Sequence, residues 1–244
     1  MPRSRNQVTE WLNNLLEPDR FADYCPNGLQ VEGRKSIDRL VTGVTASQSL
    51  IDAALKANAD AILVHHGFFW RSENPCIVGM KARRLRQLLL GEINLYAYHL
   101  PLDCHPKLGN NATLGRLMGI VHPQPVDPQD PTLPLFFGDL PESVSLQHFG
   151  RSLGDILCRA PLIVGEGSVK RVFWCTGAGQ GYIEQAASLG ADVFVTGEAS
   201  EQTVHVAREC GLGFIAAGHH ATERYGVRAV GELLECELGC KHQF

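Results

Sequence analysis

The strongest constraint on the fold is an internal duplication, in which residues 38–60 align without a gap with residues 170–192. The two copies share arginine, glutamine and isoleucine at equivalent positions, and both end in Ala-Asp. Each copy then continues in a short apolar run, AILV in the first and VFVT in the second. This order of strand, glycine-containing turn, helix and second strand predicts one βαβ unit in each copy.

A third matched segment extends the duplication. NLYAYHLPLD parallels FIAAGHHATE, which places His99 over His219 and Asp103 over Glu223. The first copy carries an added stretch that includes FFWRSENPCIVGM, and this stretch predicts an extra loop. We therefore predict an α/β fold of two pseudo-symmetric α/β lobes that arose from an internal duplication and face each other.

A proline-rich stretch, PQPVDPQDPTLP at 123–134, separates the two copies and is typical of a linker. We place the boundary near residue 125, with an N-terminal α/β lobe at 1–125 and a C-terminal α/β lobe at 126–244. The opening MPRSRNQVTEWLNNLL predicts an amphipathic helix, and SVSLQHFGRSLGDIL at 143–157 predicts another.

Composition excludes several broad functions. A net charge of −4 and the lack of a large Lys/Arg cluster give no strong nucleic-acid signal. No apolar run approaches the roughly 20 residues that a membrane span needs, and the first residues do not resemble a secretory signal. The eight cysteines are scattered without a C-x-x-C pair, which favours free thiols and a cytoplasmic location.

The first group of candidate ligands is the pair His65-His66, which follows the apolar run AILV. In α/β sheets, ligands bind at the carboxyl ends of strands. Adjacent strand residues point to opposite sides, so both rings face one site only if the strand ends there, and Gly67 permits that bend. Two purely structural histidines are the alternative.

The second group is HLPLDCHPKLGNN, in which His99 and Asp103 follow another predicted strand. Asp103 offers the carboxylate that divalent metals accept beside imidazoles, although it could instead cap a turn. We expect Asn110 and Asn111 to cap the helix that follows. His105 is a secondary candidate at the surface or behind the ligands.

The third group is GHHATERYG, in which His219 and Glu223 are four residues apart and share one face of a helix. Such a spacing lets one turn offer an imidazole and a carboxylate to a single ion, although it is also common on solvated helices. His220 would point away. Glu198 occupies the position in the second copy that His66 occupies in the first, so we expect it behind the ligands.

Three strand ends thus offer metal-type ligands, and we expect them to meet in the cleft between the lobes. Five ligands are too many for one tetrahedral zinc site with an open position. They suit two divalent ions about 3.5–4 Å apart that share a carboxylate. His99 would be a sixth ligand or would orient one of the others, and His99 or Glu198 would help to transfer protons.

Six separated blocks of the sequence resemble one known family over nearly the whole chain. They are PNGLQVEG, TGVTAS, ADAILVHHGFFW, YHLPLDCHPKLGNN, TGEASEQ and GHHATERYG. The chain is similar to the short bacterial form of the NGG-one-interacting-factor-three-like proteins, which are also described as GTP cyclohydrolase I type 2 homologues with a dinuclear metal centre.

The resemblance implies that five residues bind two divalent metal ions per subunit, namely His65, His66, Asp103, His219 and Glu223. It also implies a toroidal homohexamer with the metal sites facing an internal cavity. Imidazole and carboxylate ligands do not distinguish Zn, Fe, Mn or Ni.

Three functions are compatible with these features. The leading hypothesis is a metal-dependent hydrolase that acts on a nucleotide or a related small molecule, with a GTP cyclohydrolase-like reaction suggested by resemblance. No P-loop is present to hold a triphosphate, so a nearby histidine or arginine would be needed. The alternatives are an iron-dependent redox enzyme and a non-catalytic metal-binding regulatory or scaffold ring protein.

Overall fold

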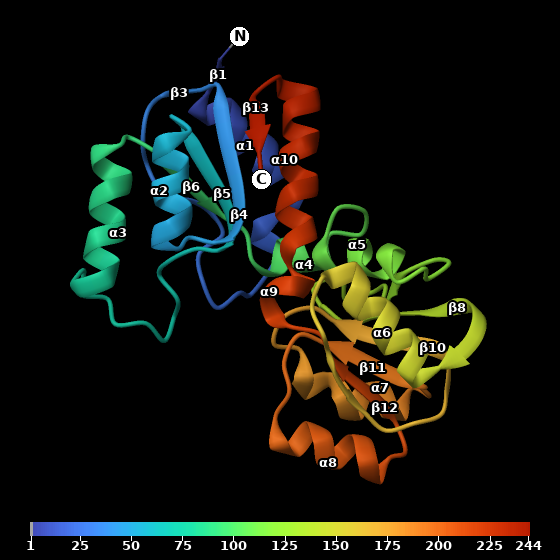
Figure 1. Ribbon diagram of the computed structural model, residues 1–244. Helices are drawn as coiled ribbons and strands as arrows, with labels where there is room; N and C mark the ends of the chain where they lie inside the picture. The colour runs from blue at the N-terminus through green and yellow to red at the C-terminus, as the bar shows by residue number, and fades with distance from the viewer. Residues whose placement is uncertain (1) are drawn as a thin grey trace. The chain divides into compact units, whose positions relative to one another are not determined.

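The computed structural model describes residues 2–244, which divide into two units (Figure 1). The first unit comprises the chain up to Leu102 together with Gly226–Phe244, and the second comprises Asp103–Tyr225. The predicted boundary near residue 125 therefore lies inside the second unit. No helix among the described residues is both long enough and apolar enough to cross a membrane.

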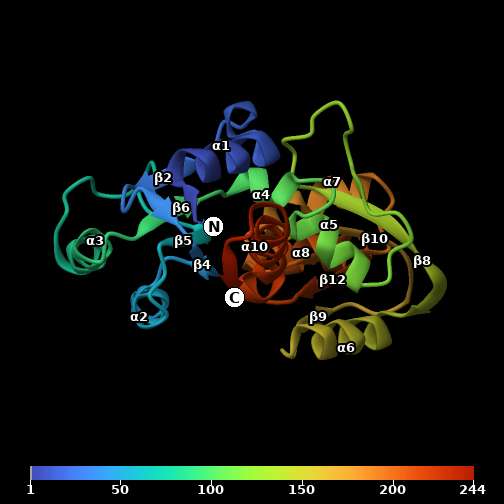
Figure 2. The same cartoon turned by 90° about the horizontal axis from the view of Figure 1, so that it is seen from above.

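The first unit is a five-stranded sheet with helices on both faces (Figures 1 and 2). Its strands, in order across the sheet, are β13 (Lys241–Gln243), β4 (Arg39–Thr45), β5 (Ala61–His66), β6 (Asn94–Ala97) and β2 (Gly28–Val31). All are parallel except β2, which pairs antiparallel with β6. A short antiparallel pair, β1 (Arg3–Ser4) and β3 (Ser36–Ile37), lies outside this sheet.

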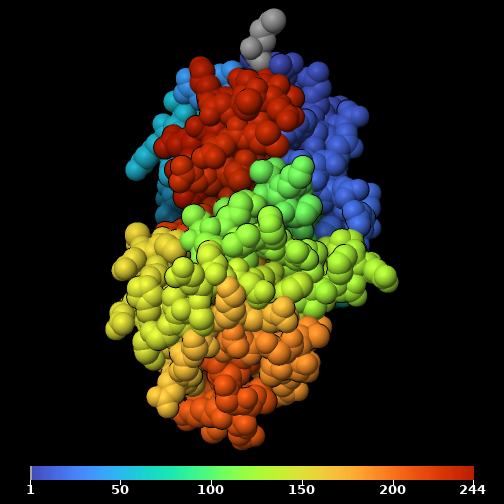
Figure 3. Space-filling model, turned by 90° about the vertical axis from the view of Figure 1, so that its right-hand side faces the viewer, coloured from blue at the N-terminus to red at the C-terminus, as the bar shows by residue number. Residues whose placement is uncertain are grey.

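One face of the first sheet is covered by α2 (Gln48–Lys56) and α3 (Gly79–Leu90), and the other by α1 (Arg5–Leu16) and α10 (Arg224–Leu238). The predicted N-terminal helix is confirmed as α1, whose N-cap Ser4 forms a capping box with Gln7. Trp11 Nε1 donates to Glu237 at 2.8 Å, so the two ends of the chain lie together, as the red and blue atoms in Figure 3 show.

The second unit is a six-stranded sheet, again with helices on both faces (Figure 1). The strand order is β7 (Gln124–Pro125), β8 (Phe136–Ser145), β10 (Ser168–Cys175), β11 (Val193–Thr196), β12 (Gly213–Ala216) and β9 (Leu162–Val164). Helices α5 (Asn110–Leu117) and α6 (Leu146–Leu157) pack on one face, and α7 (Ile183–Ser188) and α8 (Glu201–Glu209) on the other.

Backbone pairing explains why the units do not divide at residue 125. The proline-rich stretch begins with β7, which pairs with β8 in the second sheet. Upstream of it, α5 contributes Ala112 and Leu114 to the same core as Trp174. The chain end returns to the first sheet, where β13 pairs with β4. The unit to which each segment belongs is therefore decided by long-range strand pairing and not by its order in the sequence.

The duplication is visible in the hydrogen bonding of the two parallel ladders. Strands β4, β5 and β6 of the first unit and β10, β11 and β12 of the second have the same order and direction. The repeated Ala-Asp explains part of the sequence match: Asp60 Oδ2 accepts from the two backbone amides at the start of β4, at 2.8 and 2.9 Å. Asp192 Oδ2 does the same in its copy, at 2.8 and 2.7 Å.

The third strands correspond with a small difference from the sequence alignment. Ala61 pairs with Asn94, whereas the equivalent residue of the second copy, Val193, pairs with Gly213. The sequence alignment matched Asn94 with Phe214, so it is wrong by one residue along this strand.

Candidate metal centre

The carboxyl end of β5 brings two histidine rings to one side of the first unit. His65 is fully buried and His66 is partly exposed. Their ring centroids lie 4.5 Å apart, although adjacent strand residues normally point to opposite faces. The strand ends at His66, and the expected change of direction there is confirmed.

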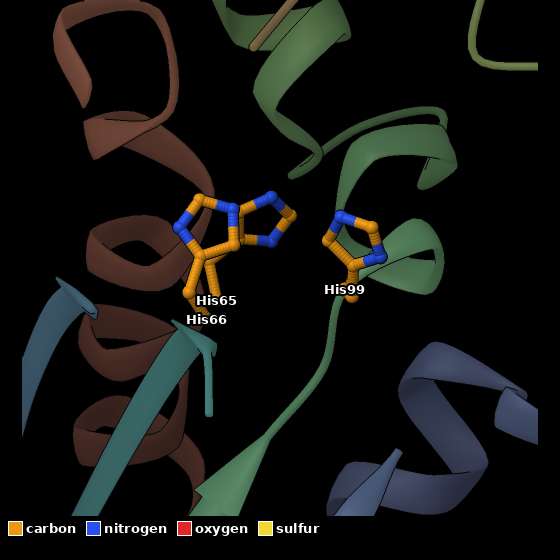
Figure 4. A group of neighbouring side chains, drawn as sticks. All are labelled: His65, His66 and His99. Atoms are coloured by element: carbon orange, nitrogen blue, oxygen red, sulfur yellow. The ribbon is translucent and has the colours of Figure 1, made fainter. Parts of the chain in front are cut away.

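A third imidazole reaches the same place from the end of β6 (Figure 4). The ring centroid of His99 lies 5.0 Å from that of His65 and 5.7 Å from that of His66. One ring nitrogen of each residue lies within 4.8 Å of the others. Because three imidazole nitrogens at this spacing are a suitable donor set for a divalent transition metal, the first unit holds a candidate metal-binding group.

The Nδ1 atoms of these rings face oxygen atoms. His65 Nδ1 lies 3.1 Å from the backbone oxygen of Tyr98, and because a carbonyl oxygen only accepts, this nitrogen donates. His66 Nδ1 lies 3.3 Å from Thr45 Oγ1. Metal-binding histidines commonly donate their second ring nitrogen to oxygen, which fixes the ring and directs the other nitrogen to the ion. The arrangement therefore fits metal binding through Nε2.

His99 is oriented by Asp23, a residue that the sequence analysis did not single out. His99 Nδ1 donates to Asp23 Oδ1 at 2.7 Å. Asp23 also accepts from the Asn27 side chain at 2.9 Å and from the backbone of Leu100 at 2.9 Å. Burial acts to raise the pKa of Asp23, but these bonds, above all that of His99, outweigh it and lower the pKa to about 2. Asp23 is thus a fixed anion that holds the ring.

The Asp23–His99 pair predicts a specific pH dependence of stability. The pKa of Asp23 is lower in the folded chain than its ordinary value of 3.8, so its contribution is present above about pH 4 and is lost as pH falls through about 2. We expect Asp23→Asn to be less stable than the unsubstituted protein at neutral pH. Denaturant unfolding between pH 2 and 7 should show this difference shrinking below pH 4; a constant difference would contradict it.

Helix α4 (Leu100–Cys104) begins in the first unit and ends in the second, where Asp103 lies among buried polar partners. Its side chain accepts from Asn110 Nδ2 at 2.9 Å and from Thr176 Oγ1 at 3.1 Å. Asn111 Nδ2 donates to the backbone oxygen of Asp103 at 3.2 Å, and its Oδ1 accepts from the backbone of Thr176. The expected capping role of the asparagines is wrong, because Gly109 is the N-cap of α5. Both instead hold Asp103.

His219 and Glu223 meet at the short helix α9 (His219–Thr222), as their spacing predicts. His219 Nε2 lies 3.2 Å from Glu223 Oε2, and His219 Nδ1 lies 2.6 Å from Glu198 Oε1. Glu223 is almost fully buried, whereas Glu198 is exposed. The close carboxylate of Glu223 raises the pKa of His219 to about 9 against the opposing effect of burial, and Glu198 adds to the rise. His219 would therefore have to give up a proton before it could bind a metal ion.

Gly177 leaves the space that Glu223 occupies. A Cβ atom at this position would overlap Glu223 Oε1 and lie 3.1 Å from His219 Nε2. The backbone of Gly177 has φ +65°, a conformation that glycine adopts readily. A buried carboxylate beside an imidazole, in a space that only glycine permits, is a second donor group suited to a divalent ion.

The remaining histidine candidates have other surroundings. His105 Nδ1 accepts from the backbone amides of Lys107 and Leu108, at 3.2 and 3.0 Å, and so stabilises a turn. His220 is exposed on the surface of the second unit. Neither belongs to the candidate metal-binding groups described for the two units.

The sequence profile of Duf34/NIF3 (NGG1p interacting factor 3) matches residues 4–244. The chain belongs to the Duf34/NIF3 family. Two relatives named "GTP cyclohydrolase 1 type 2 homolog" support this assignment. One, from Pseudomonas aeruginosa, is 53% identical over 97% of this chain and 94% of its own length. Another, from Allochromatium vinosum, is 54% identical over 97% of this chain and 93% of its own length.

Solved structures of Duf34/NIF3-like chains have the same fold. Protein ybgI, which is described as a protein of unknown function, is 47% identical, with a TM-score of 0.94 over 99% of this chain and 97% of that chain. A protein from Thermus thermophilus is 36% identical, with a TM-score of 0.90 over 99% and 97%. These similarities extend over the whole α/β fold of this Duf34/NIF3 protein.

Proposed function

We propose that this Duf34/NIF3 protein is a metal-dependent hydrolase that acts on a nucleotide or a related small molecule. Two divalent ions would be bound by ligands from both units, namely His65, His66, Asp103, His219 and Glu223. The observation that carries the proposal is the shared arrangement of histidines in the two units. In each unit, an imidazole Nδ1 bonds to oxygen while the ring lies beside further metal-type ligands.

The carboxylates that we propose as ligands lie close in the sequence to the points where the chain crosses between the units. The chain passes from the first unit to the second between Leu102 and Asp103, and it returns between Tyr225 and Gly226. The carboxylates that we propose as ligands are therefore at or within three residues of these crossing points in the sequence. Asp103 follows His99 by four residues, so one short segment connects the candidate groups of the two units.

The chemistry follows from the donor set. When bound, divalent ions lower the pKa of a water ligand toward 7 and supply a nucleophile at neutral pH. We leave His99 outside the proposed ligand set. Asp23 fixes its ring through Nδ1, so that Nε2 can exchange a proton with substrate. Glu198 bonds to His219 at 2.6 Å and is exposed, so it can pass a proton to solvent. We assign proton transfer to these two residues.

The names of the relatives suggest the first substrate to test. Opening of the guanine imidazole ring adds water at C8, and a second water releases that carbon as formate. Purified protein loaded in turn with Zn, Fe, Mn and Ni should be incubated with GTP, modified nucleotides and phosphoesters. Formate release from GTP would support ring opening, and phosphate release alone would indicate a phosphoesterase. Metal binding without turnover of any compound would contradict the hydrolase and favour a scaffold.

Assembly as a homohexamer and a cytoplasmic location remain proposals that rest on resemblance and on sequence composition. One surface of the first unit supports assembly, because several apolar side chains on and before α3 are exposed. They are Ile77, Val78, Met80, Leu89 and Leu90. Exposed apolar side chains at a protein surface commonly take part in protein–protein contacts when they form one patch.

A further inference from the structure

The second unit contains a cavity of about 320 Å³ beside one of the proposed metal ligands. Its lining includes His219, His220, Arg159 and Arg224. Three of these residues lie on the segment that begins at α9 and continues into α10, and Arg159 follows the end of α6. The cavity therefore combines two guanidinium groups and an exposed imidazole with His219.

Within residues 2–244, neither of the two arginines forms an ion pair with a carboxylate. Arg224 Nη2 donates to the backbone oxygen of Leu157 at 2.9 Å, and its Nε has no hydrogen-bond partner. Neither Arg224 nor Arg159 forms an ion pair, whereas Arg34 and Arg171 do. Two guanidinium groups that line one cavity without an ion-pair partner favour an anion, even in a chain with a net charge of −4.

Close packing keeps Arg159 beside the candidate metal ligands. A Cβ atom at Gly218 would overlap the guanidinium of Arg159, so the absence of a side chain lets Arg159 lie against the residue that precedes His219. Gly218 has φ +101°, which also requires glycine. The backbone is thus shaped to accept this arginine.

We propose that the cavity binds the phosphate chain of the substrate through Arg159 and Arg224, while the reacting part of the substrate lies toward His219. This inference rests on the proposed hydrolase function and narrows its substrate class to phosphorylated compounds. Arginine suits the role because its planar guanidinium donates paired hydrogen bonds to phosphate oxygens. The cavity would serve in place of a P-loop, which the sequence lacks.

The test compares the binding of GTP, guanosine and tripolyphosphate to the metal-loaded protein by calorimetry. Arg159→Gln should weaken the binding of GTP and tripolyphosphate by roughly 10- to 100-fold, because a charged hydrogen-bond donor is lost. Guanosine binding and metal content should not change. Arg159→Lys keeps the charge but loses the paired donors, so its affinity for GTP should lie between those of the unsubstituted protein and Arg159→Gln.

Arg151→Gln is the matched control, because Arg151 lines a neighbouring cavity with Arg159 but does not line the proposed one. It should bind GTP as the unsubstituted protein does. Equal GTP affinity in Arg159→Gln, or equal loss in Arg151→Gln, would overturn the inference. Tripolyphosphate binding that depends on Arg159 without any turnover would retain the phosphate site while rejecting the hydrolase. Turnover that does not change in Arg159→Gln would retain the hydrolase while rejecting the phosphate site.

Discussion

Replacing Asp103 by asparagine is expected to reduce the affinity for divalent metal by about 100-fold or more while leaving the second unit folded. In typical sites, the loss of one residue that only supports a ligand lowers the metal affinity roughly 10- to 100-fold. The substitution of Asp103 would remove the charge of a proposed ligand itself, so we expect a loss at the upper end of this range or beyond it. The buried side chain accepts from Asn110 and Thr176 through Oδ1, and an amide oxygen can accept the same two bonds. The change therefore removes the charge and preserves most of the packing.

Metal content by mass spectrometry and unfolding followed by circular dichroism would measure both effects. Asp139→Asn is a suitable control in the same unit, because Asp139 forms an exposed ion pair with Arg171 and such pairs contribute little to stability. The control should keep its metal. Undiminished metal in a folded Asp103→Asn protein would remove Asp103 from the ligand set.

Replacing Gly177 by alanine is expected to displace Glu223 and so to remove metal with only a modest loss of stability. The added Cβ overlaps Glu223 Oε1, which is the end of a side chain and can move away. The left-handed backbone, at φ +65°, adds roughly 1–2 kcal/mol of destabilisation for any residue with a Cβ. The expected signature is a small decrease in the free energy of unfolding together with a large decrease in metal content.

Gly119→Ala separates these two effects. Gly119 lies in the same unit with φ +77°, and a Cβ atom there would meet no atom within 4 Å. In Gly119→Ala the free energy of unfolding should decrease by a similar amount, but the metal content should not change. If both variants keep equal metal, the close contact between position 177 and Glu223 does not matter for binding. If Gly177→Ala fails to fold while Gly119→Ala folds, the displacement of Glu223 is more costly than we expect.

The parallel core of each unit could be predicted because its signals are local. The repeated Ala-Asp reflects an aspartate that accepts from two consecutive backbone amides, and this role is the same in both copies. The meeting of His65 and His66 followed from a strand that ends at the second of them. The proximity of His219 and Glu223 followed from helical spacing.

The features that were missed depend on contacts between distant parts of the chain. Asp23 reaches His99 across 76 residues, and nothing in the spacing of either segment indicates that contact. Asn110 and Asn111 stand where a helix cap is expected, but Gly109 is the N-cap and their side chains donate to Asp103. The predicted boundary near residue 125 differs from the division of the structure, because β7 pairs with the second sheet before the proline-rich stretch ends.

The number of divalent ions per chain tests the central claim most directly. It should be counted in protein purified from its native host, in parallel with His66→Ala from the first unit and Glu223→Gln from the second. We predict two ions in the unsubstituted chain and a marked loss in each folded variant, because the ligands that we propose include residues of both units. A full complement of ions in either variant, or no divalent metal in the native protein, would contradict a dinuclear centre formed by both units.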